Sequence, residues 1–283
     1  MLNRVVHALA CPHCGAALTQ RERALLCTAG HTFDIAKQGY VNLLPGATKH
    51  SADTREMVEA RAEFLAAGHY APLSGALVEL ARRTADPAVS GCVVDIGGGT
   101  GYYHARVMDA LPDAAGVLLD ISKFAARRAA KAHPRISAAV ADAWQALPLQ
   151  DGAASLVLNT FAPRNGPELR RILAPGGALL VVTASPGHLQ ELVDALGLLR
   201  VDDRKESRLT EQLAPYFTLA GTERLTRTMT LDHRALAQLV AMGPNAWHHD
   251  AGDVRERVRK LPDPCPVTLS VTLTAWRPAA CAG

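Results

Sequence analysis

One nine-residue segment constrains the fold of this chain more than any other: residues 93–101 read VVDIGGGTG. An apolar run over residues 92–96 carries Asp95 near its end and leads directly into this glycine loop, after which a helix is expected from about Tyr102. Glycines permit tight backbone angles and let a ligand approach the main chain. The helix N-terminus that follows offers unpaired N–H groups and the positive end of a dipole. This order predicts a ligand site at the carboxyl ends of parallel strands.

Short apolar runs bounded by Gly, Asp or Pro follow one another from residue 92 onward, with helix-like stretches between them. The runs are CVVDIG, AGVLLD, ISAAVA, ASLVLN and ALLVVTA, and the helical stretches include ISKFAARRAAKAH and PELRRIL. This alternation predicts βαβ units in a parallel sheet covered on both faces. Towards the C-terminus, HRALAQLVAM predicts another helix and the alternating TLSVTLTAW an antiparallel edge strand.

The 283 residues suggest one large domain, or one domain plus a small module. We expect a cysteine-bearing module over 1–44, a linker and helical segment over 45–85 that is broken near Gly68, and the α/β domain over 86–283. With 48% apolar residues and a net charge of +3, the composition neither indicates nor excludes nucleic-acid binding. We find no apolar run of bilayer length and no signal-peptide pattern, and the cysteine spacing is typical of a metal site in a reducing compartment. We therefore expect a cytoplasmic protein.

Two short motifs near the N-terminus have the spacing of metal ligands. CPHCG and CTAGH give C-x2-C, twelve intervening residues and C-x3-H. Zinc needs four ligands in a tetrahedron, and because the protein fills all four positions the predicted zinc is structural and not catalytic. The predicted ligands are Cys11, Cys14, Cys27 and His31. The alternatives are His13 in place of His31, or three free cysteines beside a surface histidine.

The glycine loop alone is compatible with a plain turn or with a dinucleotide-binding fingerprint. The residues in and after it resemble the E/D-x-G-x-G-x-G signature of class I methyltransferases: Asp95, Gly97, Gly99 and Gly101, with Thr100 inside the loop. Asp120 ends the next run, where such enzymes hold ribose hydroxyls, and Asp142 follows the third run, where they contact the adenine amino group. LRRILAPGGALLVVT resembles their L-x-P-G-G strand start. The resemblance implies a class I (Rossmann-like) domain that binds S-adenosyl-L-methionine.

Three further blocks narrow the resemblance: HTFDIAKQGYVNLLP over 31–45, MVEARAEFLAAGHYAPL over 57–73 and MGPNAW over 242–247. With the cysteine module, they are similar to the RlmA-type 23S rRNA guanine-N(1)-methyltransferases along nearly the whole chain. This implies methyl transfer from S-adenosylmethionine to guanine N(1) in a hairpin loop of 23S rRNA. It also implies a homodimer whose zinc modules help to form an RNA-binding cleft. A composition rich in Ala, Arg, Leu and Gly is similar to the branch associated with resistance to the macrolide tylosin.

The same resemblance implies cofactor roles for Tyr70 of the GHY block and His188 of PGHLQEL. Tyr70 could instead pack the linker helix, and His188 could cap a helix. NTFAPRN departs from the family pattern, but Asn159, Phe161 and Pro163 lie where many methyltransferases build the substrate pocket. Phe161 could stack on an extruded base or could be a core aromatic. In MGPNAW, Gly243 replaces the usual Thr of the family.

Basic residues offer candidate RNA contacts, whereas no residue identifies itself as the acceptor of the guanine proton. A helix expected over 121–135 would place Lys123, Arg127 and Lys131 on one face, for phosphates or simply for solvent. It also includes Arg128 and Arg135, and the cysteine module adds Arg4, Arg21, Arg23 and Lys37. Two other functions stay open: a methyltransferase of a small metabolite, and a catalytically silent RNA-binding module. The intact Asp and Gly series disfavours the silent module, and the basic cysteine module disfavours the metabolite enzyme.

Overall fold

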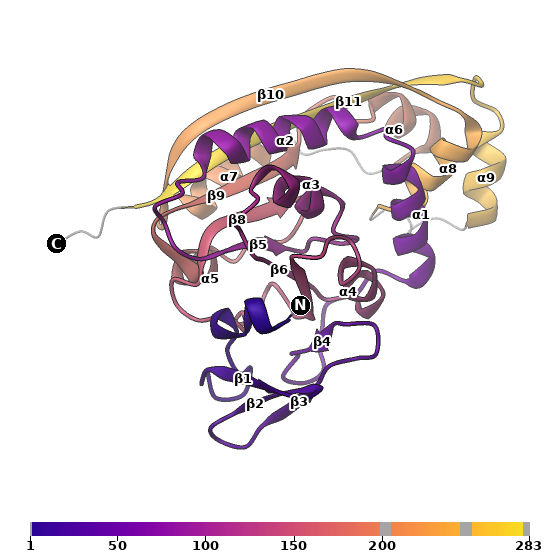
Figure 1. Ribbon diagram of the computed structural model, residues 1–283. Coiled ribbons are helices and arrows are strands. Elements are labelled where there is room, and N and C mark those ends of the chain that lie inside the picture. Colours follow the sequence, from indigo (N-terminus) through magenta and orange to yellow (C-terminus); the bar gives the residue numbers. More distant parts are fainter. Residues whose placement is uncertain (1, 199–204, 244–250, 280–283) are drawn as a thin grey trace.

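The computed structural model describes residues 2–198, 205–243 and 251–279, and within them a large mixed β-sheet carries helices on both faces (Figure 1). The five apolar runs are all strands of this sheet, so the predicted doubly wound parallel arrangement is confirmed. They are β5 (Cys92–Ile96), β6 (Gly116–Asp120), β7 (Ile136–Val140), β8 (Ala154–Thr160) and β9 (Leu173–Ala184). Strand β5 pairs in parallel with β6 on one side and with β8 on the other. The strand order therefore reverses at β5, and ligands bind in the crevice at such a switch point.

Two long antiparallel strands extend the sheet beyond β9, in the order β9, β11, β10. Strand β11 (Cys265–Pro278) contains the predicted TLSVTLTAW strand, but it lies inside the sheet and β10 (Phe217–Leu231) forms the edge. The sequence did not reveal β10 because most of its side chains are exposed on both faces, so its residues lack apolar alternation.

The helices form two layers whose cores alternate along each strand. Val93 and Val94, neighbours on β5, belong to different cores because successive strand side chains point to opposite faces. The first core includes residues of α1, α2, α3, α4, α6, α8 and α9, whereas the second includes residues of α5 and α7. The helices are α1 (Arg55–Ala66), α2 (Ala71–Thr84), α3 (Tyr102–Ala110), α4 (Lys123–Ala129), α5 (Gly166–Ile172), α6 (Gln190–Leu196), α7 (Lys205–Leu213), α8 (His233–Ala241) and α9 (Ala251–Val258).

The N-terminal module is a three-stranded antiparallel ribbon that packs on the second core. It comprises the 3-10 turns η1 (Leu2–Arg4) and η2 (Val6–Ala8) and the strands β1 (Leu18–Arg21), β2 (Ala24–Cys27) and β3 (Thr32–Asp34). The short strand β4 (Val41–Asn42) then pairs in parallel with β7, so the last residues of the predicted module belong to the edge of the main sheet. The division at residues 44 and 85 stays a prediction.

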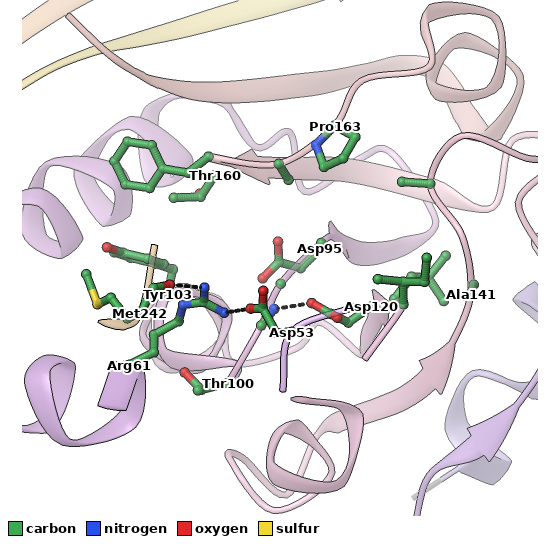
Figure 2. Close-up of a pocket in the computed structure, with 18 of the residues that line it drawn as sticks. Asp53, Arg61, Asp95, Thr100, Tyr103, Asp120, Ala141, Thr160, Pro163 and Met242 are labelled. Atoms are coloured by element: carbon green, nitrogen blue, oxygen red, sulfur yellow. Dashed lines mark hydrogen bonds and ion pairs between the residues drawn. The ribbon is translucent and has the colours of Figure 1, made fainter. Parts of the chain in front are cut away.

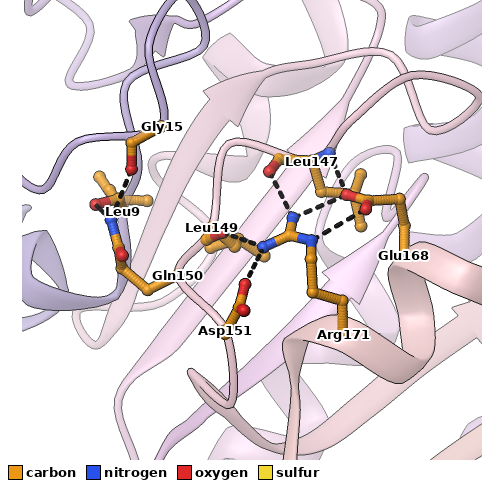
Figure 3. Close-up of polar contacts among 8 residues, drawn as sticks. All are labelled: Leu9, Gly15, Leu147, Leu149, Gln150, Asp151, Glu168 and Arg171. Atoms are coloured by element: carbon orange, nitrogen blue, oxygen red, sulfur yellow. Dashed lines mark hydrogen bonds and ion pairs between the residues drawn. The ribbon is translucent and has the colours of Figure 1, made fainter.

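Main-chain and side-chain hydrogen bonds attach the ribbon to the loop that follows β7 (Figure 3). The Gln150 side chain donates to the carbonyls of Leu9 and Gly15, at 3.2 and 3.4 Å. The main chain adds a bond from Ala10 N–H to the carbonyl of Pro148 at 3.0 Å. The ribbon is therefore fixed to the sheet by directional bonds as well as by apolar packing.

Arg171 of α5 holds this docking loop in shape (Figure 3). Its guanidinium donates to the carbonyls of Leu147 and Leu149 at 2.9 and 2.7 Å. It also forms a two-pronged ion pair with Glu168, at 2.8 and 2.7 Å, and contacts Asp151 at 2.8 Å. The loop that receives the ribbon is thus held by one cation.

Two expectations about the helix after β6 change. The helix expected over 121–135 is the shorter α4, so Lys131 lies beyond its end. Arg135 is not available to phosphates, because its guanidinium donates to the main-chain carbonyls of Met108, Leu111 and Ala114.

The predicted helix near residue 233 is confirmed as α8. Residues 244–247 of the MGPNAW block lie outside the described part of the chain, and so does Cys281. In the described segments, no helix combines the length and apolar character needed to span a membrane.

Candidate active site and metal centre

A cavity of about 500 Å³ opens at the carboxyl ends of β5, β6, β7 and β8, directly above the glycine loop (Figure 2). This volume is in the range of small-molecule and cofactor sites. The sequence-predicted residues that line it are Tyr70, Asp95, Gly97, Gly99, Thr100, Asp120, Asp142, Phe161 and Pro163. Gly101, Asn159 and His188 are not lining residues. The fold thus brings together most of the predicted site from segments far apart in the sequence.

The glycine loop joins β5 to α3 and has a backbone that other residues would not tolerate. Gly97 has a φ of +66°, and a Cβ atom there would lie 2.6 Å from the Cβ of Ala162. A Cβ on Gly98 would lie 2.5 Å from a carboxylate oxygen of Asp95. Glycine is therefore required both for the turn and for the close packing of the loop against neighbouring strand ends.

Two carboxyl groups face the cavity from the ends of β5 and β6, the buried one of Asp95 and the partly buried one of Asp120 (Figure 2). Asp120 accepts hydrogen bonds from the N–H groups of Gly99 and Ser122, both at 2.8 Å. Burial raises the pKa of Asp120 to about 6, although these two bonds oppose the shift. Burial, and then the charge of Asp120, raise the pKa of Asp95 well above its ordinary value. Asp95 Oδ1 has no partner among the described residues, and such an orphaned buried acceptor fits a ligand that carries hydrogen-bond donors.

Asp142 follows β7 and is held by four hydrogen bonds. Thr48 Oγ1 donates to its Oδ2 at 2.6 Å, and the ring Nδ1 of His50 lies 3.0 Å from the same oxygen. Trp144 N–H and the Gln145 amide add bonds of 3.0 and 3.2 Å. Burial raises the pKa of Asp142, but the four bonds outweigh it and hold the pKa below its ordinary value. Asp142 is therefore a fixed carboxylate, and the linker segment supplies two of its partners.

The structure adds lining residues that the sequence reasoning did not assign. Arg61 of α1 donates to the carboxylate of Asp53 and to the main-chain carbonyl of Met242 (Figure 2). Ser122 Oγ donates to the main-chain carbonyl of Asp53 at 2.7 Å. Tyr103, at the start of α3, also lines the cavity. Arg61 lies in the block over residues 57–73, but the sequence of that block does not show what its guanidinium contacts.

The position of Tyr70 is compatible with both interpretations of this residue, and its contact with the cofactor stays a prediction. Its side chain is buried, and its ring meets Phe64 edge to face with centroids 5.1 Å apart. It also lines the cavity. Burial raises its pKa, so the hydroxyl keeps its proton at neutral pH.

Phe161 stands at the end of β8 in a left-handed conformation, with a φ of +53°, and its side chain is 43% exposed. The core-aromatic interpretation of Phe161 is therefore wrong. The ring of His188 stacks near it with centroids 6.1 Å apart, and His188 Nδ1 accepts from the N–H of Ser270 at 3.2 Å. Asn159 is fully buried and donates to the carbonyl of Pro163 at 2.8 Å, so it shapes the loop and does not line the cavity.

Four side chains of the ribbon form a compact cluster whose ligand atoms all lie within 4.8 Å of one another. The Sγ atoms of Cys14 and Cys27 are 3.8 Å apart. His31 Nδ1 lies 3.5 Å from Cys11 Sγ and 3.3 Å from Cys27 Sγ. A tetrahedral zinc site with Zn–S near ~2.3 Å and Zn–N near ~2.0 Å has edges of about 3.8 and 3.5 Å. The four residues, which are Cys11, Cys14, Cys27 and His31, therefore fit one structural zinc ion.

His13, the alternative fourth ligand, lies outside this cluster. Its ring stacks on Phe33 with centroids 5.8 Å apart and tilts against His31. Burial raises the pKa of the Cys27 thiol, but hydrogen bonds with His31, Ala29 and Cys14 bring it to about 6. A thiol that ionises near neutral pH is ready to bind a metal.

Comparison with known proteins agrees with both halves of this architecture. Residues 9–52 match the family description "RlmA, N-terminal", a zinc ribbon, and residues 93–177 match "Methyltransferase domain". The chain is 60% identical over 278 residues to the 23S rRNA (guanine(748)-N(1))-methyltransferase of Streptomyces fradiae, covering 98% of this chain and 99% of that protein. A Micromonospora griseorubida relative, provisionally assigned 23S rRNA (guanine-N(1)-)-methyltransferase activity, is 50% identical over 95% of this chain and 97% of its own.

Among solved structures, the complex between the Haloferax volcanii Trm112 methyltransferase activator and its provisionally assigned methyltransferase gives a TM-score of 0.50 at 17% identity. That match covers 82% of this chain and 100% of the other, and it shows the fold alone. The sheet order, the glycine loop and the strand-end carboxyl groups define a class I methyltransferase that depends on S-adenosylmethionine, joined to a zinc ribbon. Given the two full-length relatives, the chain belongs to the RlmA family of 23S rRNA (guanine-N(1)-)-methyltransferases.

Proposed function

We propose that this enzyme transfers the methyl group of S-adenosylmethionine to N(1) of a guanine in a hairpin loop of 23S rRNA. The target that we propose is guanine 748, the nucleotide in the name of the Streptomyces fradiae relative. The observation that carries the proposal is 60% identity over 98% of the chain, together with the intact cavity at the switch point.

The cavity offers groups that match the parts of the cofactor. Asp120 would accept from the ribose hydroxyls, and Asp142 Oδ1, which receives only the Trp144 N–H among the described bonds, has a lone pair for the adenine amino group. The unpaired oxygen of Asp95 and the adjoining loop over residues 97–101 would face the rest of the molecule. When bound, the cofactor supplies an electrophilic methyl group on a sulfonium.

Guanine N(1) carries a proton and is a weak nucleophile at neutral pH, so orientation has to supply much of the acceleration. Good orientation of reacting groups is worth up to about 7–11 kcal/mol. Phe161 and Pro163 follow the end of β8 and line the cavity, on a segment that packs against the glycine loop. They would form the wall against which an extruded guanine is held in line with the methyl group. His188, stacked on the exposed ring of Phe161, would support that wall and, as the resemblance implies, contact the cofactor.

The four-residue cluster of the ribbon would hold one zinc ion with a structural role, because the protein fills all four positions. A homodimer, a cytoplasmic location and tylosin resistance complete the proposal, and they rest on the resemblance to the family. Light scattering after size-exclusion chromatography tests the dimer. The inhibitory concentration of tylosin for a sensitive host, with and without the expressed gene, tests resistance.

The decisive experiment is a methylation assay. Purified protein and labelled S-adenosylmethionine are incubated with unmethylated 23S rRNA hairpins, and N(1) methylation is mapped by primer-extension stops. The matched control is the same hairpin with adenine in place of the target guanine, because adenine N(1) presents a lone pair where guanine has an N–H, so the control tests whether the enzyme selects guanine. We expect label and a stop only with guanine. Label in small molecules with none in any RNA would refute the proposal in favour of a metabolite methyltransferase.

A further inference from the structure

Few large apolar side chains are exposed in the described part of this protein, and two of them lie at one cavity. In the described segments they are Trp144 at 48%, Leu219 at 45% and Phe161 at 43%. Two of the three, Trp144 and Phe161, line the same cavity, whereas Leu219 lies on the edge strand β10. Exposed aromatic side chains gathered at one cavity indicate a binding surface.

The two aromatic residues stand on loops that are tied together. Trp144 N–H donates to Asp142, and its carbonyl accepts from the side chain of Asn165 at 3.3 Å. Asn165 ends the same loop that carries Phe161 and begins α5. The backbone of Trp144 is thus held on both sides while nearly half of its side chain remains open to solvent. A group held in this way loses little conformational freedom when it binds a partner.

The position of the indole favours RNA over the cofactor as its partner. The polar groups suited to ribose and adenine are less exposed: Asp120 is partly buried and Asp142 is 3% exposed, whereas Trp144 is 48% exposed. Among the described residues, its ring neighbour is His50, whose side chain is 47% exposed, at a centroid distance of 5.9 Å. Unpaired loop bases are the parts of a structured RNA that stack on such side chains.

We propose that Trp144 is a positioning residue that stacks on an unpaired base of the RNA loop next to the guanine held at Phe161. The inference rests on the proposed function, because it needs an RNA loop at this cavity. Stacking on an aromatic side chain tolerates any base and changes affinity by at least about five-fold. Trp144 therefore sets the register of the loop over the cavity without reading its sequence.

The test uses Trp144→Ala, the conservative Trp144→Phe, and Leu219→Ala as a matched control for removing an exposed apolar side chain. A set of 23S rRNA hairpins carries 2-aminopurine at one unpaired loop position each, because its fluorescence is quenched by stacking. For every protein we measure quenching with S-adenosylhomocysteine present, the affinity for S-adenosylhomocysteine by calorimetry, and kcat and KM for the unlabelled hairpin.

We expect quenching at one loop position with wild type, Trp144→Phe and Leu219→Ala, and its loss with Trp144→Ala. The KM for the hairpin should rise at least about five-fold in Trp144→Ala and recover largely in Trp144→Phe, with cofactor affinity within about two-fold throughout. Weaker binding of S-adenosylhomocysteine with an unchanged KM for RNA would overturn the inference and make Trp144 a cofactor contact. An unchanged KM and unchanged quenching would also overturn it. A failure of the proposed function would be distinguishable from a failure of this inference, because the wild-type enzyme would then transfer no labelled methyl group to any hairpin.

Discussion

Replacing Arg171 with alanine would remove the cation that holds the ribbon-docking loop. Arg171 makes two hydrogen bonds to Glu168, one each to the carbonyls of Leu147 and Leu149, and one to Asp151 (Figure 3). Alanine would leave the Leu149 carbonyl without its donor, the Leu147 carbonyl with only the N–H of Leu149, and the Glu168 carboxylate without its cation. The pKa of Glu168, which burial raises and Arg171 lowers, would rise in the variant.

The size of the effect follows from how exposed each partner is. The Asp151 side chain is 83% exposed, so its bond to Arg171 contributes little. Arg171 is 29% exposed and Glu168 16%. Each hydrogen bond to a charged group contributes about 1.5–3 kcal/mol, but bonds of one group do not add. Loss of one partner of a fully buried ion pair costs about 3–5 kcal/mol. For this partly exposed group, we expect a loss of about 3 kcal/mol.

Urea unfolding of wild type, Arg171→Ala and Arg170→Ala measures the loss. Arg170 is the matched control, because it is the same residue type on the same helix, and the described part of the chain shows no hydrogen bond or ion pair for it. Arg170→Ala should change the free energy of unfolding by no more than about 0.5 kcal/mol. In Arg171→Ala, the amide of Gln150, which donates to the carbonyl of Ala8, should also exchange its hydrogen faster. Equal free energies of unfolding for the two variants would refute the bracing role.

Three further predictions concern the cavity, the metal and the RNA. Affinity for S-adenosylhomocysteine should fall as the pH drops below about 6, because Asp120 then takes up a proton; calorimetry across this range should show the fall in wild type and not in Asp120→Asn. The stability of the free enzyme depends on pH in the opposite direction. Because the pKa of Asp120 is raised in the folded state, its protonated form stabilises the fold, and this contribution is lost as the pH rises through about 6. Cys27→Ser should lose zinc by elemental analysis, whereas Cys265→Ala, a buried cysteine outside the cluster, should retain it. Arg55 and Lys123 both lie over the ring of Phe124. If each contacts one phosphate, replacing either with alanine should reduce the magnitude of the slope of log affinity for RNA against log salt by about 0.7.

The strands of the parallel sheet could be predicted because each is buried on both faces and therefore reads as an apolar run between turn residues. The burial of β5 at all five positions is an example. The edge strand β10 could not be predicted in this way, since water covers most of its side chains. The helix after β6 was predicted too long because the basic residues beyond Ala129 continue a helical composition although the helix ends there.

For the cavity, the predictable residues were those next to the strand ends, where local sequence order fixes position. Residues that reach the cavity through tertiary contacts were not predictable. Thr48 is separated by 94 residues from its partner Asp142, and Arg61 by 181 residues from Met242. Neither contact can be predicted from a local sequence pattern. The exposure of Phe161 was equally hidden, because an aromatic residue after an apolar strand suits a core and a pocket alike.

The zinc ribbon and the cofactor cavity are connected by one short stretch of chain. After the ribbon, β4 pairs with β7, and the N–H of Leu43 donates to the carbonyl of Val140. Two residues beyond Val140 stands Asp142, and the chain that leaves β4 returns to it through Thr48 and His50. A segment anchored at β4 arrives at Asp142 with few conformations left to lose, whereas a free linker would have to be ordered at each binding event. The pairing of β4 with β7 therefore limits where the segment that follows can lie, and this segment carries the two side chains that hold Asp142 in place.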